Sequence, residues 1–183
     1  MDFAASFPHL VRSVALMAPA GLIRELPRSY VELRQAAIDG KDEKELTRLL
    51  VDVLGVSEKE PVATATDDVA ANVDAIVHWQ YKHHQGHAKS FVSTLQYGPV
   101  QGQHKVWQKA CNKLKSKEGN DRLVVICGDE DFVVQAEHVK EDLGNMVGSG
   151  KYCFETVNGG HGFLLDEKAC EHVVETLSRE WAL

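Results

Sequence analysis

Three short apolar segments stand out along the chain, and each is followed by residues that favour a turn. They are Val11–Met17, Leu123–Cys127 and Lys151–Val157. A strand that is buried on both faces of a parallel sheet has this composition, because neither face is left to carry polar residues. The pattern therefore predicts three strands of a parallel sheet.

Helical patterns follow the second and third of these segments. Apolar residues recur at helical spacing over Val134–Met146 and again over Leu164–Trp181. Asp166 and Glu167 stand in the first turn of the second pattern, where a carboxylate favours the positive end of the helix dipole. Strands that alternate with helices of this length are typical of a parallel sheet with crossover helices, so the predicted fold class is α/β.

The stretch from Arg24 to Glu118 breaks this rhythm and carries helical patterns alone. Asp42 and Glu45 are spaced as in a capping box, and Gly55 favours the end of that helix. Further helices are predicted after Asp67-Asp68, around Phe91–Leu95 and around Val106–Ala110. A helical insertion of roughly 90 residues is too long for a simple connection. We therefore expect a helical cap over residues 24–118, inserted into a core portion made of residues 1–23 and 119–183.

Composition narrows the classes of protein that this chain can belong to. Of its 183 residues, 44% are hydrophobic, 26% are charged, and the formal net charge is −7. An acidic chain of this kind gives no electrostatic reason to expect binding to nucleic acid or to an anionic membrane. No apolar run approaches the ~20 residues of a membrane span, and the first residues do not have the pattern of a signal peptide. We expect a cytoplasmic protein.

Neither the four cysteines nor the histidine-rich stretch 78–87 predicts a metal site. The four cysteines have no Cys-x-x-Cys spacing, and reduced thiols are the simplest interpretation. His83 and His87 are four residues apart, but Gly86 interrupts the helix between them and no carboxylate or cysteine is near. No metal and no cofactor is predicted.

The candidate chemistry lies directly after two of the predicted strands. Asp131 follows the second strand and His161 follows the third, with one strand–helix–strand unit between them. Ligands of open α/β sheets bind beyond the carboxyl ends of the strands, where loops from neighbouring strands meet. A carboxylate beside an imidazole holds one tautomer of the ring and stabilises the imidazolium as the ring accepts a proton. Asp131 and His161 are therefore predicted to be catalytic.

Both loops resemble those of a known superfamily. The stretches 128–131 (Gly-Asp-Glu-Asp) and 158–161 (Asn-Gly-Gly-His) resemble the acid and histidine loops of the α/β-hydrolases, where they follow the seventh and eighth strands. The opening residues 3–20 resemble the end of the helix after the nucleophile elbow and then the sixth strand. The resemblance implies the C-terminal part of an α/β-hydrolase sheet with a cap, with Asp131 as the triad acid and His161 as the base.

Other interpretations of these residues remain open. Asp129 is an alternative acid two residues earlier, Asp131 could be an ordinary turn residue, and His161 could be structural. The resemblance also implies a nucleophile (Ser, Asp or Cys) on a Gly-x-Ser-x-Gly turn, which the 183 residues lack. The serine whose neighbours come nearest to this pattern is Ser149, but it precedes a predicted strand instead of following one. By the resemblance, the nucleophile lies upstream of Met1, and we expect a truncated chain that is inactive alone and is not labelled by a fluorophosphonate probe.

The expected function is hydrolysis of a small, fairly apolar ester, amide or related acyl compound. Phe163, Trp79 and Trp107 are the candidates for contact with this small-molecule substrate. The alternative is a non-catalytic α/β-hydrolase remnant that acts as a binding or interaction protein. An open edge on the Val11–Met17 strand predicts a marginally stable chain or self-association through that edge.

Overall fold

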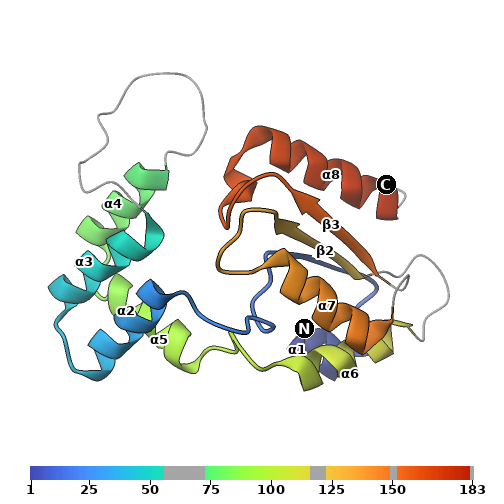
Figure 1. Ribbon diagram of the computed structural model, residues 1–183, viewed down its shortest axis with the longest axis horizontal. Coiled ribbons are helices and arrows are strands. Elements are labelled where there is room, and N and C mark those ends of the chain that lie inside the picture. Colours follow the sequence, from blue (N-terminus) through green and yellow to red (C-terminus); the bar gives the residue numbers. More distant parts are fainter. Residues whose placement is uncertain (56–72, 116–122, 149–151, 182–183) are drawn as a thin grey trace. The chain divides into compact units, whose positions relative to one another are not determined.

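The computed structural model describes residues 1–55, 73–115, 123–148 and 152–181. Within these ranges the chain forms a three-stranded parallel sheet and eight α-helices, so the fold is α/β (Figure 1). The chain divides into two compact units. The sheet unit comprises Met1–Glu25 and Pro99–Leu183, and the helical unit comprises Leu26–Gly98.

The sheet has the strand order β1-β2-β3, with all neighbours parallel. Central β2 (Leu123–Gly128) is buried along its whole length, as the apolar run predicts. The prediction for the first strand was wrong in extent and in burial. β1 covers only Val14–Met17, and all four of its residues are half-buried. Within the described residues β1 pairs with β2 alone, so one of its edges has no neighbouring strand to cover it. β3 is Cys153–Val157, and only Val157 in it is buried, so the predicted burial on both faces was wrong for this strand as well.

The sheet unit places helices on both faces of the sheet (Figure 1). Ala15 and Met17 of β1 pack toward α8 (Glu167–Trp181), whereas Val14 packs toward the other face. Because successive strand residues point to opposite faces, α8 covers one face and the remaining helices of this unit cover the other. These are α1 (Asp2–Ser6), α6 (His104–Lys115) and α7 (Ala136–Val147), with the short 3-10 turn η1 (Pro8–Leu10).

The helix expected over Leu164–Trp181 is divided in two. A 3-10 turn, η2 (Phe163–Leu165), comes first, and α8 begins at Glu167. Asp166 separates them in extended conformation, and its Oδ1 accepts a hydrogen bond from Ala169 N at 2.9 Å. Aspartate is favoured in this capping position because it satisfies a backbone N–H that has no partner within the helix.

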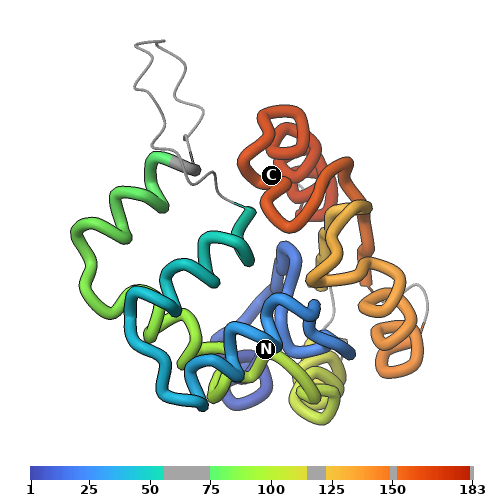
Figure 2. The backbone as a smooth tube through the Cα atoms, turned by 60° about the vertical axis from the view of Figure 1, so that its left-hand side comes forward, coloured from blue at the N-terminus to red at the C-terminus, as the bar shows by residue number. Residues whose placement is uncertain are grey.

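The helical unit contains α2 (Arg28–Ile38), α3 (Glu43–Leu54), α4 (Val73–His83) and α5 (His87–Tyr97) (Figure 2). The predicted cap of α3 is confirmed, since Asp42 Oδ1 accepts from Glu45 N at 2.9 Å. Gly55 ends the helix in the left-handed conformation, also as predicted. The predicted cap at Asp67-Asp68 lies outside the described residues. The expected cap boundaries were 24 and 118, whereas α6 groups with the sheet unit.

The two chain segments that connect the sheet unit to residues 26–98 are joined to each other by backbone hydrogen bonds. Gly21 N donates to Val100 O and Gln103 N donates to Gly21 O, both at 2.9 Å. Arg24 and His104 then both bind Asp142 of α7, at 2.8 and 3.1 Å. Asp142 is only 8% exposed, and its pKa is lowered because the hydrogen bonds from Arg24 and His104 outweigh the effect of burial.

Replacement of Asp142 with alanine should destabilise the sheet unit by about 1–3 kcal/mol, because two partners lose a largely buried acceptor. Denaturant unfolding of both proteins measures the difference. The matched control is Glu32→Ala, which removes the exposed pair with Arg28 and should cost less than about 0.5 kcal/mol. Equal losses in the two variants would contradict a special role for Asp142.

Candidate functional site

Two neighbouring strands deliver the candidate site at one edge of the sheet. β2 ends at Gly128 and β3 ends at Val157, and these two residues are paired in the parallel register. The two loops that follow therefore begin side by side. They remain joined by backbone hydrogen bonds from Asp129 N to Val157 O at 2.9 Å and from Glu130 N to Gly159 O at 3.0 Å.

The structure brings Asp131 and His161 together, as the two loops predicted. Asp131 Oδ2 lies 2.8 Å from His161 Nδ1. Asp131 Oδ1 accepts from the backbone N–H groups of Val133 and Val134, each at 2.8 Å. The Asp131 side chain is fully buried, whereas the His161 side chain is 47% exposed. One oxygen of the carboxylate is thus held by the main chain and the other is directed at the ring.

The electrostatics of the pair favour an ionised carboxylate. Burial alone raises the pKa of Asp131, but the hydrogen bonds from His161, Val134 N and Val133 N outweigh it, so the pKa lies below its ordinary value. The hydrogen bond to Asp131 raises the pKa of His161, although burial opposes this. An ionised carboxylate can only accept hydrogen bonds, so Nδ1 of His161 carries the proton that is donated to Oδ2.

This arrangement leaves Nε2 as the reactive atom of His161. With the proton on Nδ1, the neutral ring presents a lone pair at Nε2. No described residue forms a hydrogen bond with Nε2, and the ring is half-exposed. The pair can therefore accept a proton at Nε2, hold the resulting imidazolium against Asp131, and return the proton.

The pH dependence of the pair can be measured directly by NMR titration of His161. Its pKa should lie above 6.5, the ordinary value, and should fall in Asp131→Asn, which removes the negative partner. Because the folded pKa is raised, the stability from His161 is present below pH ~6.5 and is lost as the pH rises through the folded pKa. The Asp131 contribution is present above pH ~3.9 and is lost as the pH falls through its lowered pKa. An unshifted His161 would contradict the pairing.

The three predicted substrate-contact residues lie in three different environments. Phe163 was expected in a pocket wall, but it is 3% exposed and packs in the core beside Val124 and Ile126. Trp79 lies in the helical unit, is 54% exposed and contacts the rings of His83 and His84. Trp107 belongs to the sheet unit.

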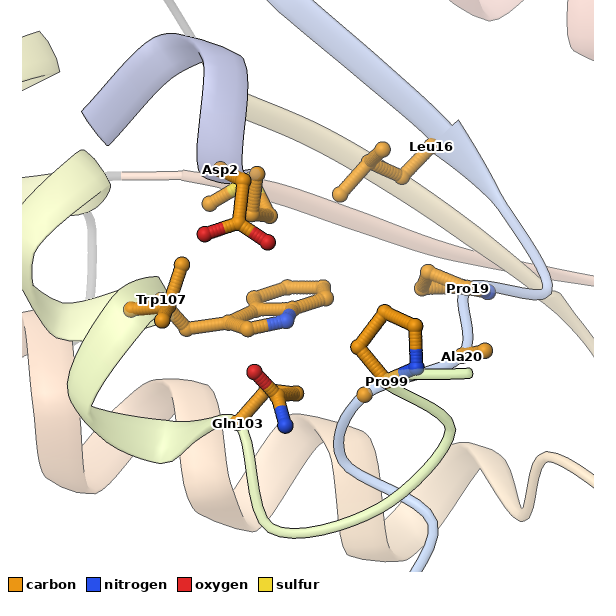
Figure 3. A pocket seen from close by; sticks show the side chains of 10 residues that line it. Asp2, Leu16, Pro19, Ala20, Pro99, Gln103 and Trp107 are labelled. Atoms are coloured by element: carbon orange, nitrogen blue, oxygen red, sulfur yellow. The ribbon is translucent and has the colours of Figure 1, made fainter. Parts of the chain in front are cut away.

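Trp107 lines a cavity of about 200 Å³ in the sheet unit. The indole ring lies between the side chains of Asp2 and Gln103, with prolines and aliphatic residues around it (Figure 3). No residue from the loops that carry Asp131 and His161 lines this cavity. The structure therefore brings the catalytic candidates together, whereas the Phe163 ring packs in the core and Trp107 lines a separate cavity of the sheet unit.

Sequence reasoning missed the main-chain part of the site. The N–H groups of Val133 and Val134 hold Asp131, yet any non-proline residue supplies such a group, so residue identity gives no signal. Asp129, the alternative acid, accepts a hydrogen bond from Gly159 N at 2.9 Å through Oδ1. The carboxylate that binds His161 is that of Asp131.

No group of three or more potential metal ligands occurs in the parts of the chain that the structure describes. All four cysteines are free thiols, and burial raises the pKa of Cys127 to about 12, with a smaller contribution from Asp131. No helix in the described ranges has the length and apolar composition that crossing a bilayer requires.

Comparison with known proteins adds no family to this picture. Neither a scan against protein-family models nor a search of curated proteins finds a match to the chain. The inference of function therefore depends on the residues and geometry of the site.

Proposed function

We propose that Asp131 and His161 are the acid and the general base of an α/β-hydrolase-type site, and that its substrate is a small, fairly apolar ester, amide or related acyl compound. The observation that carries the proposal is the 2.8 Å contact between Asp131 Oδ2 and His161 Nδ1 at the carboxyl ends of adjacent parallel strands. The Gly-Asp-Glu-Asp and Asn-Gly-Gly-His stretches that position the pair support the same family.

In the proposed reaction, His161 transfers protons and Asp131 orients it. Nε2 takes the proton of a hydroxyl nucleophile as the hydroxyl oxygen bonds to the acyl carbon, and the same proton then leaves with the departing alcohol or amine. A water molecule next attacks the acyl group, again losing its proton to Nε2, and the acid is released with the nucleophile restored. Throughout, the ionised Asp131 stabilises the positive charge on the ring.

The 183 residues contain no Gly-x-Ser-x-Gly turn, so the proposed nucleophile is one that they do not supply. The proposal therefore concerns the complete encoded protein, with any residues that precede Met1. A non-catalytic protein that keeps the same pair is the competing function.

Hydrolysis of p-nitrophenyl butyrate by the complete encoded protein tests the proposal. His161→Gln should lower kcat by about 10³-fold or more, because it removes the group that takes the proton. The matched control, His172→Gln, changes an exposed histidine on α8 and should leave kcat unchanged. A wild type without hydrolytic activity and without fluorophosphonate labelling would favour the non-catalytic alternative, and equal activity in all three proteins would exclude His161 as the base.

The proposal includes a cytoplasmic location, which suits four free thiols, and self-association of the 183-residue chain through β1. Ala18 N donates to Ile126 O, so the N–H of residue 18 points toward β2. Because the N–H groups of successive strand residues point to opposite edges, those of Ala15 and Met17 point to the edge of β1 that no described strand covers. Size-exclusion chromatography with light scattering should show an oligomer that Ala15→Pro converts to monomer, because proline is tolerated where its N–H is unpaired. A wild-type monomer that melts well above about 60 °C would contradict this expectation.

A further inference from the structure

Asp129 joins the two loops of the site through its side chain, in addition to the contact between Asp131 and His161. Two of the hydrogen bonds between these loops use backbone atoms on both sides, from Asp129 N to Val157 O and from Glu130 N to Gly159 O. In a further hydrogen bond, Gly159 N donates to Asp129 Oδ1 at 2.9 Å. Asp129 therefore binds the end of β3 as a backbone donor and the histidine loop as a side-chain acceptor.

The side-chain bond is made to a residue with an unusual backbone conformation. Gly159 has φ +128°, which residues with a side chain rarely adopt. Its N–H is held by Asp129 and its carbonyl by Glu130 N, so both ends of this residue are fixed against the loop that carries Asp131. His161 follows two residues later, and the orientation of Gly159 therefore determines where the chain presents the imidazole.

We propose that Asp129 is a positioning residue, which holds the loop 158–162 so that His161 Nδ1 meets Asp131 Oδ2. Asp129 acts as a hydrogen-bond acceptor, and its negative charge is not required. Asp131 is the charged group that raises the pKa of His161, whereas the Asp129 side chain accepts from Gly159 N. The catalytic consequence rests on the proposed hydrolase function, whereas the positioning itself does not.

Three variants of the 183-residue chain distinguish the role of Asp129 as a hydrogen-bond acceptor from any effect of its negative charge. Asp129→Ala removes the acceptor, and Asp129→Asn keeps an oxygen that accepts from Gly159 N while removing the charge. Glu130→Ala is the matched control, because it changes the adjacent exposed carboxylate and leaves the backbone bond to Gly159 in place. NMR of ¹⁵N-labelled histidine then reports the solvent exchange of the Nδ1 proton and the pKa of His161.

We expect Asp129→Ala to speed exchange of the Nδ1 proton by about tenfold, as loss of one hydrogen bond predicts, and to lower the pKa of His161. Asp129→Asn and Glu130→Ala should keep the wild-type values. A wild-type spectrum for Asp129→Ala would overturn the proposal, and so would an Asp129→Asn spectrum that matches the alanine variant, since the charge would then be the cause.

Turnover in the complete encoded protein separates this inference from the proposed function. Asp129→Ala should lower kcat by roughly ten- to a hundredfold with little change in KM, because a displaced base weakens the chemical step. If the protein shows no hydrolysis but the Nδ1 proton responds as expected, the positioning role holds and the hydrolase proposal fails. Wild-type kcat together with an unchanged Nδ1 proton in Asp129→Ala would reject the positioning role alone.

Discussion

We expect an Asp131→Asn exchange to lower kcat for the proposed hydrolysis by the complete encoded protein by about 10⁴-fold. The backbone N–H groups of Val133 and Val134 retain the single oxygen of the asparagine amide, because both point at Oδ1. The amide nitrogen then faces His161 Nδ1 and can only donate to it. The imidazole is forced into the tautomer with its proton on Nε2, and the base is lost although the geometry is preserved.

The measurement is kcat for the single variants Asp131→Asn and His161→Gln and for the double variant. Because the two residues act as one unit, the double variant should be no slower than the slower single variant. Effects that multiply would show that the two side chains work independently, which contradicts the pair as the functional unit.

Gly128→Ala should separate His161 from Asp131 and should remove a large part of the stability of the sheet unit. A Cβ at this position would collide with the carbonyl oxygen of Gly159 and would lie 2.7 Å from that of Gly160. Both obstacles are backbone atoms fixed at the end of β3, so the histidine loop must move away from Asp131. We expect a loss of about 3 kcal/mol in the free energy of unfolding, at the upper end for overpacking, and a His161 pKa near its ordinary value.

The matched control is Gly144→Ala in α7, where the nearest atom to a new Cβ is Tyr152 Oη at 3.8 Å. Alanine is the better helix former, so this variant should be as stable as the wild type or more stable by up to about 1 kcal/mol. Denaturant unfolding and His161 titration of both variants provide the comparison. A Gly128→Ala protein with wild-type stability and His161 pKa would show that the loops do not need their close approach.

Much of the fold and the contact between Asp131 and His161 could be predicted, because both depend on local signals. A buried central strand has a continuous apolar run, and β2 has one. A glycine marks where such a strand ends, and the polar residues that follow lie at the carboxyl edge of the sheet. Asp131 and His161 can therefore be located from the number of residues that separate them from the strand ends at Gly128 and Val157.

The remainder depends on tertiary contacts that a single sequence does not reveal. Phe163 follows the histidine loop, and only the position of α8 decides that its ring packs in the core. β1 is shorter than its apolar run because strand length is set by pairing with β2 over Val14–Met17. The separation of η2 from α8 follows from the hydrogen bond that Asp166 Oδ1 accepts from Ala169 N, which competes with a continuous helix.

The central claim is that Asp131 holds His161 with its proton on Nδ1 and Nε2 free to act as the base. Long-range ¹H–¹⁵N correlation of ¹⁵N-labelled histidine, at a pH above the His161 pKa, identifies the protonated nitrogen directly. The predicted result is a protonated Nδ1 and an unprotonated Nε2 in the wild type, with the two exchanged in Asp131→Asn. A wild-type ring that is protonated on Nε2, or that exchanges freely between both tautomers, would contradict the claim.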